Sequence, residues 1–148
     1  MNQKEVDVNN LELADTSSRV KAFLIDYFLI NVLVTILLWD QISTTNGGIE
    51  DLTFILGTAI VQIILIEIVY ETFFLWYYGA TIGKILSNIR VIHFDDFSKI
   101  NLPTAFGRAV MRAIDKHILM FIGFIMYFFT ESKQTLHDKI AKTLVVNA

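Results

Sequence analysis

Ionisable side chains interrupt three otherwise apolar segments of this chain, and they are the residues whose types and spacing could carry chemistry. They recur at helical intervals of three, four or seven residues, so each group lies on one face of a helix. Charged groups inside a membrane segment are energetically expensive and indicate a functional or a locking role. The residues are Arg19 and Asp26 in the first segment, Glu67 and Glu71 in the second, and Arg108, Arg112 and Asp115 in the third.

Two interpretations of these charges remain open. In the first, four acids face four bases, with Lys116 as the fourth base, and the neutral cluster locks three helices together. In the second, the cluster lines a path for protons or monovalent cations, or a site for a small ligand. Glu67 carries most weight there, because no basic residue lies within a turn of it and an unpaired buried carboxylate can take up a proton. Asp26 and Glu67 are then the protonatable groups, held by Arg19 and Arg112.

Three helices, at about 20–39, 52–78 and 104–130, are expected to position these side chains. The first two are apolar and, at ~1.5 Å per residue, long enough to cross a hydrocarbon core of about 30 Å. The third is charged in its first half, and its 12 uncharged residues, Ile118–Phe129, are too few to span alone. The sequence therefore predicts an all-α membrane protein, a small helical bundle with two transmembrane helices and a third segment. That segment either crosses the membrane with its charged face shielded by protein, or kinks, or re-enters on the same side of the membrane.

Polar segments flank and connect the helices. Residues 1–18 are acidic and are interpreted as a disordered N-terminal tail ahead of one membrane domain, 19–148. Basic residues occur at the start of the chain, in the connection 79–103 and in the tail 131–148, whereas the loop 40–51 has three acids and no base. The positive-inside rule then places the N-terminus, the connection and the tail in the cytoplasm, as parts of a multi-pass protein of the cell membrane.

A weak internal sequence repeat predicts that two of these polar segments pair with each other. The stretches GKILSNIRVI and DKIAKTLVVN share a Lys-Ile pair and end in β-branched residues. This repeat indicates a short cytoplasmic β pair between Ile89–Ile92 and Leu144–Val146. Paired strands must lie on the same side of the membrane, so this pairing favours the re-entrant form of the third segment.

The stretch GATIGK, residues 79–84, resembles a phosphate-binding loop at first sight. A Walker A loop has four residues between its glycines and a Ser or Thr after its lysine, whereas here three residues intervene and Ile85 follows. Nucleotide binding is therefore not expected. Gly79 and Gly83 are interpreted instead as a hinge where the chain leaves the second helix.

Other features argue against catalysis. The chain has no cysteine, which excludes disulfides, thiolate metal sites and cysteine nucleophiles. The cluster HFDD at 93–96 is interpreted as a solvated loop, and no Ser–His–Asp constellation has a supporting context. We therefore expect no enzyme, no cofactor, no resident metal and no nucleic-acid partner. The segment Thr135–Asp138 fits a capping box, in which Thr135 begins a short helix and Asp138 bonds back to it.

In order and spacing these features resemble the RDD family of small bacterial and archaeal membrane proteins, over about Ser18–Val146. The family takes its name from one arginine and two aspartates. In this chain the arginine is Arg19, and the two aspartates are Asp26 and Asp138, which follows His137. The family's G-x-T-x-G-K corresponds to Gly79, Thr81, Gly83 and Lys84. The arginine that opens its third segment corresponds to Arg108 or Arg112. The run HFDDFSKIN departs from the family's tighter Asp-Gly turn, and Glu67 and Glu71 have no counterpart carried over.

The resemblance implies a membrane domain for which transport of ions or small ligands has been the usual suggestion. We expect the charged cluster to move protons, monovalent cations or small ligands in the cytoplasmic half of the bilayer. Three short segments can hardly enclose a path, so a homo-oligomer is expected. The alternative is a non-transporting scaffold or accessory subunit, whose cytoplasmic parts bind a protein partner or anionic lipid.

Overall fold

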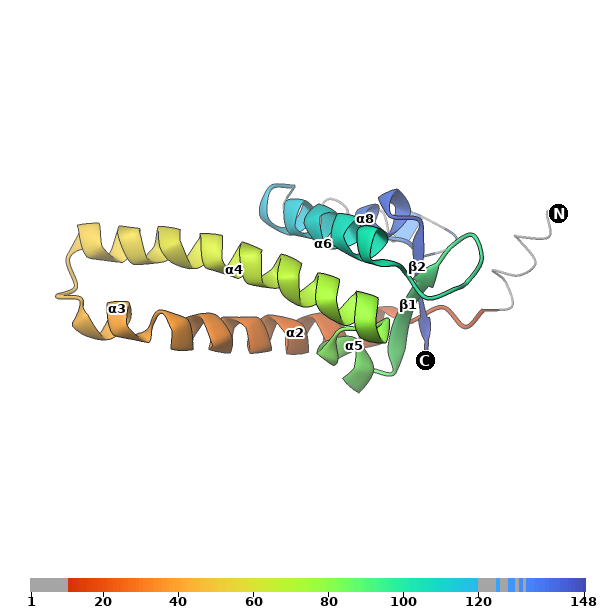
Figure 1. Ribbon diagram of the computed structural model, residues 1–148, viewed down its shortest axis with the longest axis horizontal. Coiled ribbons are helices and arrows are strands. Elements are labelled where there is room, and N and C mark those ends of the chain that lie inside the picture. The colour runs from red at the N-terminus through yellow and green to blue at the C-terminus, as the bar shows by residue number, and fades with distance from the viewer. Residues whose placement is uncertain (1–10, 120–124, 126–127, 130, 132) are drawn as a thin grey trace.

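The structure is a computed structural model that describes residues 11–119, 125, 128–129, 131 and 133–148. Its described elements are α2 Thr16–Leu37, α3 Trp39–Thr44, α4 Ile49–Tyr78, α5 Ile82–Leu86, β1 Ile89–His93, α6 Leu102–His117, α8 Leu136–Ile140 and β2 Thr143–Asn147. Helices α2 and α4 run side by side and are joined at one end through α3, and the other elements gather at the opposite end (Figure 1). We call α2, α3 and α4 the hairpin and the remaining elements the cap.

The two long helices of the hairpin owe their ends to local capping. Asp15 begins α2, because its Oδ1 accepts a hydrogen bond from Ser18 N at 3.0 Å. Gly79 ends α4 in the left-handed region, with φ of 76°. Both helices are long and apolar enough to cross a membrane, judged by length and composition. Ile30 and Val34 of α2 pack against α4, while much of the remaining apolar surface faces outward.

A small antiparallel sheet forms the centre of the cap. β1 and β2 pair in a register that sets Ile92 opposite Leu144. This confirms the predicted pairing of Ile89–Ile92 with Leu144–Val146, although each strand is slightly longer than expected. Leu75 of α4 is fully buried among apolar side chains of the sheet, so the end of the hairpin and the cap share one core.

The chain is ordered earlier than its polar start suggests. In the expected tail 1–18, the backbone N of Ala14 donates to Val145 O at 3.0 Å, and α2 already begins at Thr16. Composition could not indicate this early start, because the segment is ordered by a helix cap and by contact with a strand that lies far away in the sequence. Residues 1–10 of the tail lie outside the described residues.

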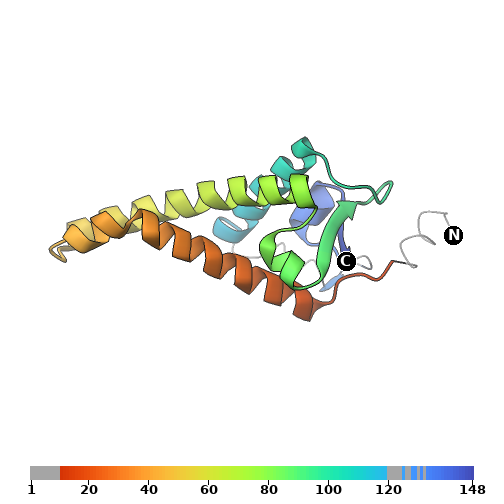
Figure 2. The ribbon, with the colours of Figure 1, turned by 60° about the horizontal axis from the view of Figure 1, so that its bottom comes forward.

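The third expected helix, 104–130, is shorter in its described part. It begins as α6, where the side chain of Asn101 accepts a hydrogen bond from Thr104 N at 3.0 Å, and it ends at His117. Most of its apolar continuation lies outside the described residues. Because β2 pairs with β1, the chain nevertheless returns to the end of the hairpin from which it left (Figure 2). The re-entrant interpretation requires such a return.

Candidate functional site

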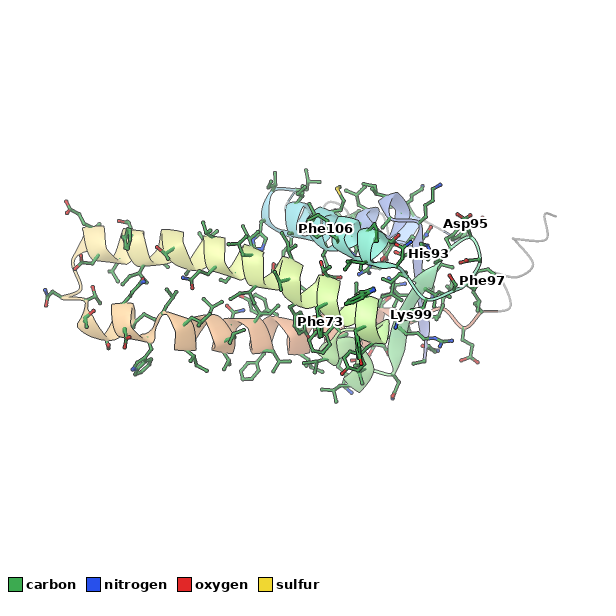
Figure 3. All side chains as sticks on the ribbon, viewed as in Figure 1. Phe73, His93, Asp95, Phe97, Lys99 and Phe106 are labelled. Carbon is green, nitrogen blue, oxygen red and sulfur yellow. The ribbon has the colours of Figure 1, made fainter. Side chains whose placement is uncertain are left out.

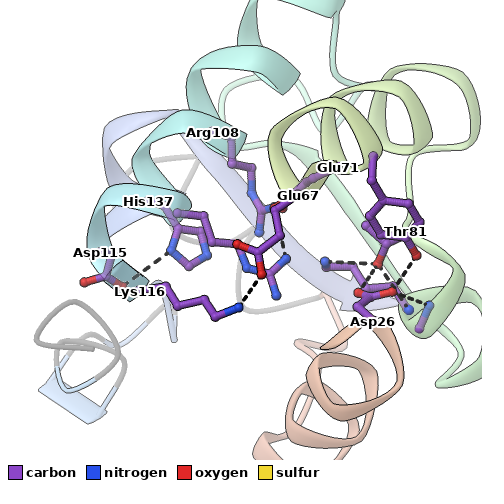
Figure 4. A network of polar contacts seen from close by, with 12 residues as sticks. Asp26, Glu67, Glu71, Thr81, Arg108, Asp115, Lys116 and His137 are labelled. Atoms are coloured by element: carbon purple, nitrogen blue, oxygen red, sulfur yellow. Dashed lines mark hydrogen bonds and ion pairs between the residues drawn. The ribbon is translucent and has the colours of Figure 1, made fainter. Parts of the chain in front are cut away.

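Asp26 is buried in α2, where three uncharged groups donate hydrogen bonds to its carboxylate (Figure 4). The hydroxyl of Tyr70 and the backbone N of Gly83 donate to Oδ1, at 2.6 and 2.8 Å. Thr81 Oγ1 donates to Oδ2 at 2.7 Å. Hydrogen bonds to a charged acceptor are stronger than neutral ones, so these donors stabilise the carboxylate inside the protein. The expected contact with Arg19 is absent from the described part of the cluster.

The GATIGK segment supplies two of these donors. Gly79 ends α4, Thr81 caps α5, and the backbone then brings Gly83 against α2. A Cβ atom on Gly83 would lie 2.2 Å from Ala22 O and 2.7 Å from Asp26 Oδ1, so the close approach requires glycine. The segment presents a backbone N–H and a hydroxyl to an anion, as a phosphate-binding loop does. Here the anion is a carboxylate of the protein itself.

Arg108 is the centre of a second buried network, and it is 1% exposed. Its guanidinium donates to Glu71 Oε1 at 2.5 Å and to Asp138 Oδ1 at 2.6 Å from Nη2 and 3.1 Å from Nε. Arg112 donates to the other oxygen of Glu71 at 3.0 Å, and Arg19 to the other oxygen of Asp138 at 3.2 Å. Each carboxylate is thus shared between two arginines, which compensates charges that would be strongly destabilising if buried alone.

Asp138 joins this network to the cap. Its Oδ2 accepts hydrogen bonds from the backbone N of Thr135 at 3.2 Å and from Thr135 Oγ1 at 2.8 Å, which confirms the predicted capping box at the start of α8. Burial opposes the ionisation of this carboxyl, but the guanidinium groups of Arg108 and Arg19 hold its pKa well below the usual range. One side chain therefore begins a helix and also binds two arginines.

Glu67 is paired, which removes the reason for treating it as the leading proton carrier. Its oxygens contact Lys116 Nζ and, at 2.9 Å, His117 Nε2, near the end of α6. These partners lie 49 and 50 residues away in the sequence. The absence of a base within one helical turn of Glu67 therefore did not show that Glu67 is unpaired. The side chains of Glu67 and Lys116 are each 14% exposed, so this pair lies at the edge of the network rather than at its centre.

Asp115 and His137 face each other where α6 meets α8. Asp115 is buried, and its Oδ2 lies 3.9 Å from His137 Nδ1, while His137 Nε2 lies 2.9 Å from Thr135 Oγ1. Burial lowers the pKa of His137 to about 3, and the guanidinium of Arg108 acts in the same direction, although the carboxylate of Asp138 opposes both. The histidine is therefore neutral in the folded protein at pH 7.

This neutral histidine predicts that the folded protein loses stability as the pH falls from about 7 to 5. In the unfolded chain His137 takes up a proton near its ordinary pKa of 6.5, whereas in the folded chain it stays neutral down to about 3. The unfolded state binds more protons in this window, so the free energy of unfolding rises with pH. Melting temperatures across the window measure the slope. We expect His137→Gln to flatten it; an unaltered slope in this variant would contradict a neutral, largely enclosed histidine.

The polar connection between β1 and α6 has local structural roles. It includes Asp95 and Lys99, which are labelled in Figure 3 at the cap end of the molecule. Asp96 Oδ1 accepts hydrogen bonds from the N and Oγ of Ser98, at 3.1 and 2.8 Å, as is common in turns. Lys99 Nζ donates to Tyr77 O at 2.5 Å, at the end of α4. Among the residues that the structure describes, no group of three or more His, Cys, Asp or Glu side chains is placed to hold a metal.

The expected single group of charges is therefore a set of adjacent networks with added members. Tyr70 was missed, although it lies three residues from Glu67 and so on nearly the same helical face. Thr81 was known only from the family motif. We call the charged side chains that these networks join the charge cluster; they are Arg19, Asp26, Glu67, Glu71, Arg108, Arg112, Lys116 and Asp138.

In the part of the chain that the structure describes, a smaller and a larger cavity border the charge cluster. The smaller, of about 20 Å³, lies among Asp26, Glu67, Glu71 and Arg112, and it is large enough for one water molecule. The larger, of about 340 Å³, is lined by apolar and basic side chains from α2, α6 and the cap, including Lys84, the last residue of GATIGK. The chemistry available at this end of the molecule is therefore the binding of small polar groups and of anions.

Comparison with known proteins identifies the family. The sequence profile of the RDD family matches residues 13–142. The uncharacterized membrane protein YteJ of Bacillus subtilis (strain 168) is 29% identical over 138 residues, covering 87% of this chain and 77% of the relative. The uncharacterized protein YckC of the same organism is 29% identical over 134 residues, covering 88% and 82%. No solved structure matches the chain. The profile match extends over most of the chain, including the hairpin and the charge cluster, and the chain therefore belongs to the RDD family.

Proposed function

We propose that this RDD protein is a non-transporting membrane scaffold, in which the hairpin anchors the chain in the bilayer and the cap is a folded platform on the cytoplasmic side. One observation carries the proposal. Each of four carboxylates in the charge cluster already accepts at least two hydrogen bonds from groups of the protein, and they are Asp26, Glu67, Glu71 and Asp138. Carboxylates held in this way fasten the cap to the hairpin and leave little capacity to carry a proton or a cation.

The distribution of charge supports this orientation. In the described chain, basic residues occur at the start of α2, after α4 and in the cap, among them Arg19, Lys84, Arg90 and Lys99. At the other end of the hairpin, α3 and the start of α4 carry Asp40, Glu50 and Asp51. The positive-inside rule then places the cap and the start of the chain in the cytoplasm. The surface between the two ends is apolar, with Phe54 and Val69 70% and 68% exposed. An exposed apolar surface of this kind is what lipid covers.

The half of the hairpin away from the cap supports a scaffold over a transporter. Between Asp26 and Asp40 in the first half of the hairpin, and between Asp51 and Glu67 in the second, the chain has no Asp, Glu, Lys, Arg or His. A charge that crossed this region would lose its hydration without meeting a partner, which costs several kcal/mol.

Asp26→Asn is expected to lower stability without removing any flux. Asparagine weakens charge-assisted hydrogen bonds from Tyr70, Thr81 and Gly83, so the free energy of unfolding should fall by about 1–2 kcal/mol. Denaturant titration in detergent measures this loss, and internal pH in vesicles under a cation gradient measures flux. Wild type and Asp26→Asn should both match protein-free vesicles. A flux that wild type shows and the variant lacks would refute the scaffold.

Transport of protons or monovalent cations by a homo-oligomer is the second candidate function. The cavity of about 20 Å³ favours it, because the cavity borders Asp26, Glu67 and Glu71 and can hold one water molecule between them. One hairpin encloses no path, so the route would run between subunits. In the same vesicles this candidate predicts a flux that requires both Asp26 and Glu67, and it predicts that cross-linking captures oligomers.

A further inference from the structure

Lys84 is a buried cation that the described residues leave without an ion pair. It is 6% exposed, and its Nζ donates to Thr81 Oγ1 at 3.3 Å. No carboxylate oxygen in the described part of the chain lies within 4.0 Å of this ammonium. Burial lowers the pKa of Lys84 to about 8, and the nearby guanidinium of Arg112 acts in the same direction, whereas the more distant carboxylates of Glu71 and Asp26 oppose both. An ammonium has three donors, so this one can still bind an anion.

The cavity of about 340 Å³ gives an anion access to Lys84. Four further basic side chains and two acidic ones line the same cavity; they are Arg19, Arg108, Arg112 and Lys116, with Asp115 and Asp138. Asp138 is already bound by two arginines, and Arg112 donates one described hydrogen bond, to Glu71. The wall therefore presents more basic than acidic groups.

The remaining wall of the cavity is apolar and reaches the outer surface of the hairpin. Val20, Phe23 and Leu24 line it from α2, and Ile89 and Val145 line it from the sheet. Val20 and Leu24 are 41% and 57% exposed, so the cavity adjoins the surface that faces lipid in the proposed topology. Basic groups next to an apolar surface at the cytoplasmic side of a membrane suit an amphiphile with an anionic head.

A nucleotide suits this place less well than a lipid. The groups of GATIGK that could cradle a phosphate are the N–H of Gly83 and the hydroxyl of Thr81, and both already bind Asp26. Only the side chain of Lys84 remains from this motif, and it lines the cavity. The ligand therefore needs one anionic group and an apolar part, rather than a chain of phosphates.

We propose that this cavity binds the phosphate headgroup of an anionic phospholipid from the cytoplasmic leaflet. Lys84 and Arg112 contact the phosphate, and the beginning of an acyl chain lies along Phe23 and Leu24. The inference rests on the proposed function, because only a cytoplasmic cap brings the cavity to the headgroups of that leaflet. The bound lipid neutralises Lys84 and fixes the depth at which the cap meets the membrane.

Lys84→Gln tests the site. The probe is short-chain phosphatidylglycerol, added to the full chain in neutral detergent, with bound lipid counted by native mass spectrometry. The variant is expected to bind at least about tenfold more weakly, the effect of losing one buried charge-assisted contact. Lys84→Arg should restore binding. Lys139→Gln removes the same charge from an exposed position in α8 and should bind like wild type. Equal binding by Lys84→Gln and Lys139→Gln would overturn the site.

Further measurements distinguish a lipid phosphate from free phosphate, and loss of binding from loss of folding. Zwitterionic phosphatidylcholine of the same chain length should bind at least about tenfold more weakly than phosphatidylglycerol. Inorganic phosphate should leave the melting temperature unchanged; a shift equal to that from phosphatidylglycerol would overturn the assignment to a lipid. If Lys84→Gln does not fold, Arg112→Gln replaces it with the same expectation. The flux assay reads the proposed function separately, so a protein that carries flux and still binds the lipid at Lys84 refutes the scaffold alone.

Discussion

Arg108→Gln is expected to lower the free energy of unfolding by about 3–5 kcal/mol, the cost of breaking a buried ion pair from one side. The guanidinium is 1% exposed and bridges Glu71 of α4 to Asp138 of α8. Glutamine cannot supply a charge to both carboxylates, which then face each other across the junction of hairpin and cap. Denaturant titration of the purified protein in detergent, followed by tryptophan fluorescence, measures the loss.

Arg90→Gln is the matched control for this change. It also removes an arginine charge, but from an exposed position in β1, and should alter stability by no more than about 0.5 kcal/mol. Adding Glu71→Gln to Arg108→Gln should recover part of the loss, because it removes one of the two carboxylates that have lost one of their two arginines. Equal unfolding midpoints for Arg108→Gln and Arg90→Gln would show that the charge cluster does not hold the cap to the hairpin.

Gly83→Ala is expected to destabilise the protein by about 3 kcal/mol, from overpacking and the loss of a hydrogen bond to a charged acceptor. The new Cβ would meet Ala22 O at 2.2 Å, and this atom belongs to the backbone of α2. The contact is relieved only if α5 moves away from α2. That movement separates Gly83 N from Asp26 Oδ1, now 2.8 Å apart. The same denaturant titration measures the effect.

Gly57→Ala provides the comparison, because this glycine is exposed in α4 and an added Cβ would meet no atom within 4 Å. Alanine is the better helix former, so this variant should be as stable as wild type or more stable by up to about 1 kcal/mol. If Gly83→Ala unfolds at the wild-type midpoint, α5 is not packed on α2 at this distance and the assignment of GATIGK as the partner of Asp26 is wrong.

The fold was predictable where the signal is local or repeated. The long apolar runs predicted both helices of the hairpin, because length and hydrophobicity are properties of the segment itself. The sequence repeat shared by the two β-branched segments predicted the sheet. The start of α2 was not predicted, since the polar residues before Arg19 obtain their order from the cap at Asp15 and from contact with Val145. Composition indicates neither contact.

The members of the charge cluster were predictable, but their pairing was not. Charges in apolar helices are conspicuous, so Arg19, Asp26, Glu71 and Arg108 could be found from sequence. The choice of partner depends on how helices from distant parts of the chain meet. Asp26 is held by hydroxyl and backbone groups rather than by an arginine. Polar uncharged partners have no such signature, because threonine, tyrosine and glycine are ordinary in membrane helices and turns.

The contact between Arg19 and Asp138 ties the folding of this protein to the order in which it is synthesised. The two residues are 119 positions apart, so at roughly 5–20 residues per second the ribosome adds Asp138 about 6–24 s after Arg19. The hairpin can enter the membrane during that interval, but Arg19 and Arg108 lack a common carboxylate until α8 has been made. A chain interrupted before α8 therefore lacks the carboxylate that binds these two arginines together, so α2 and α6 do not share this contact at the junction of hairpin and cap.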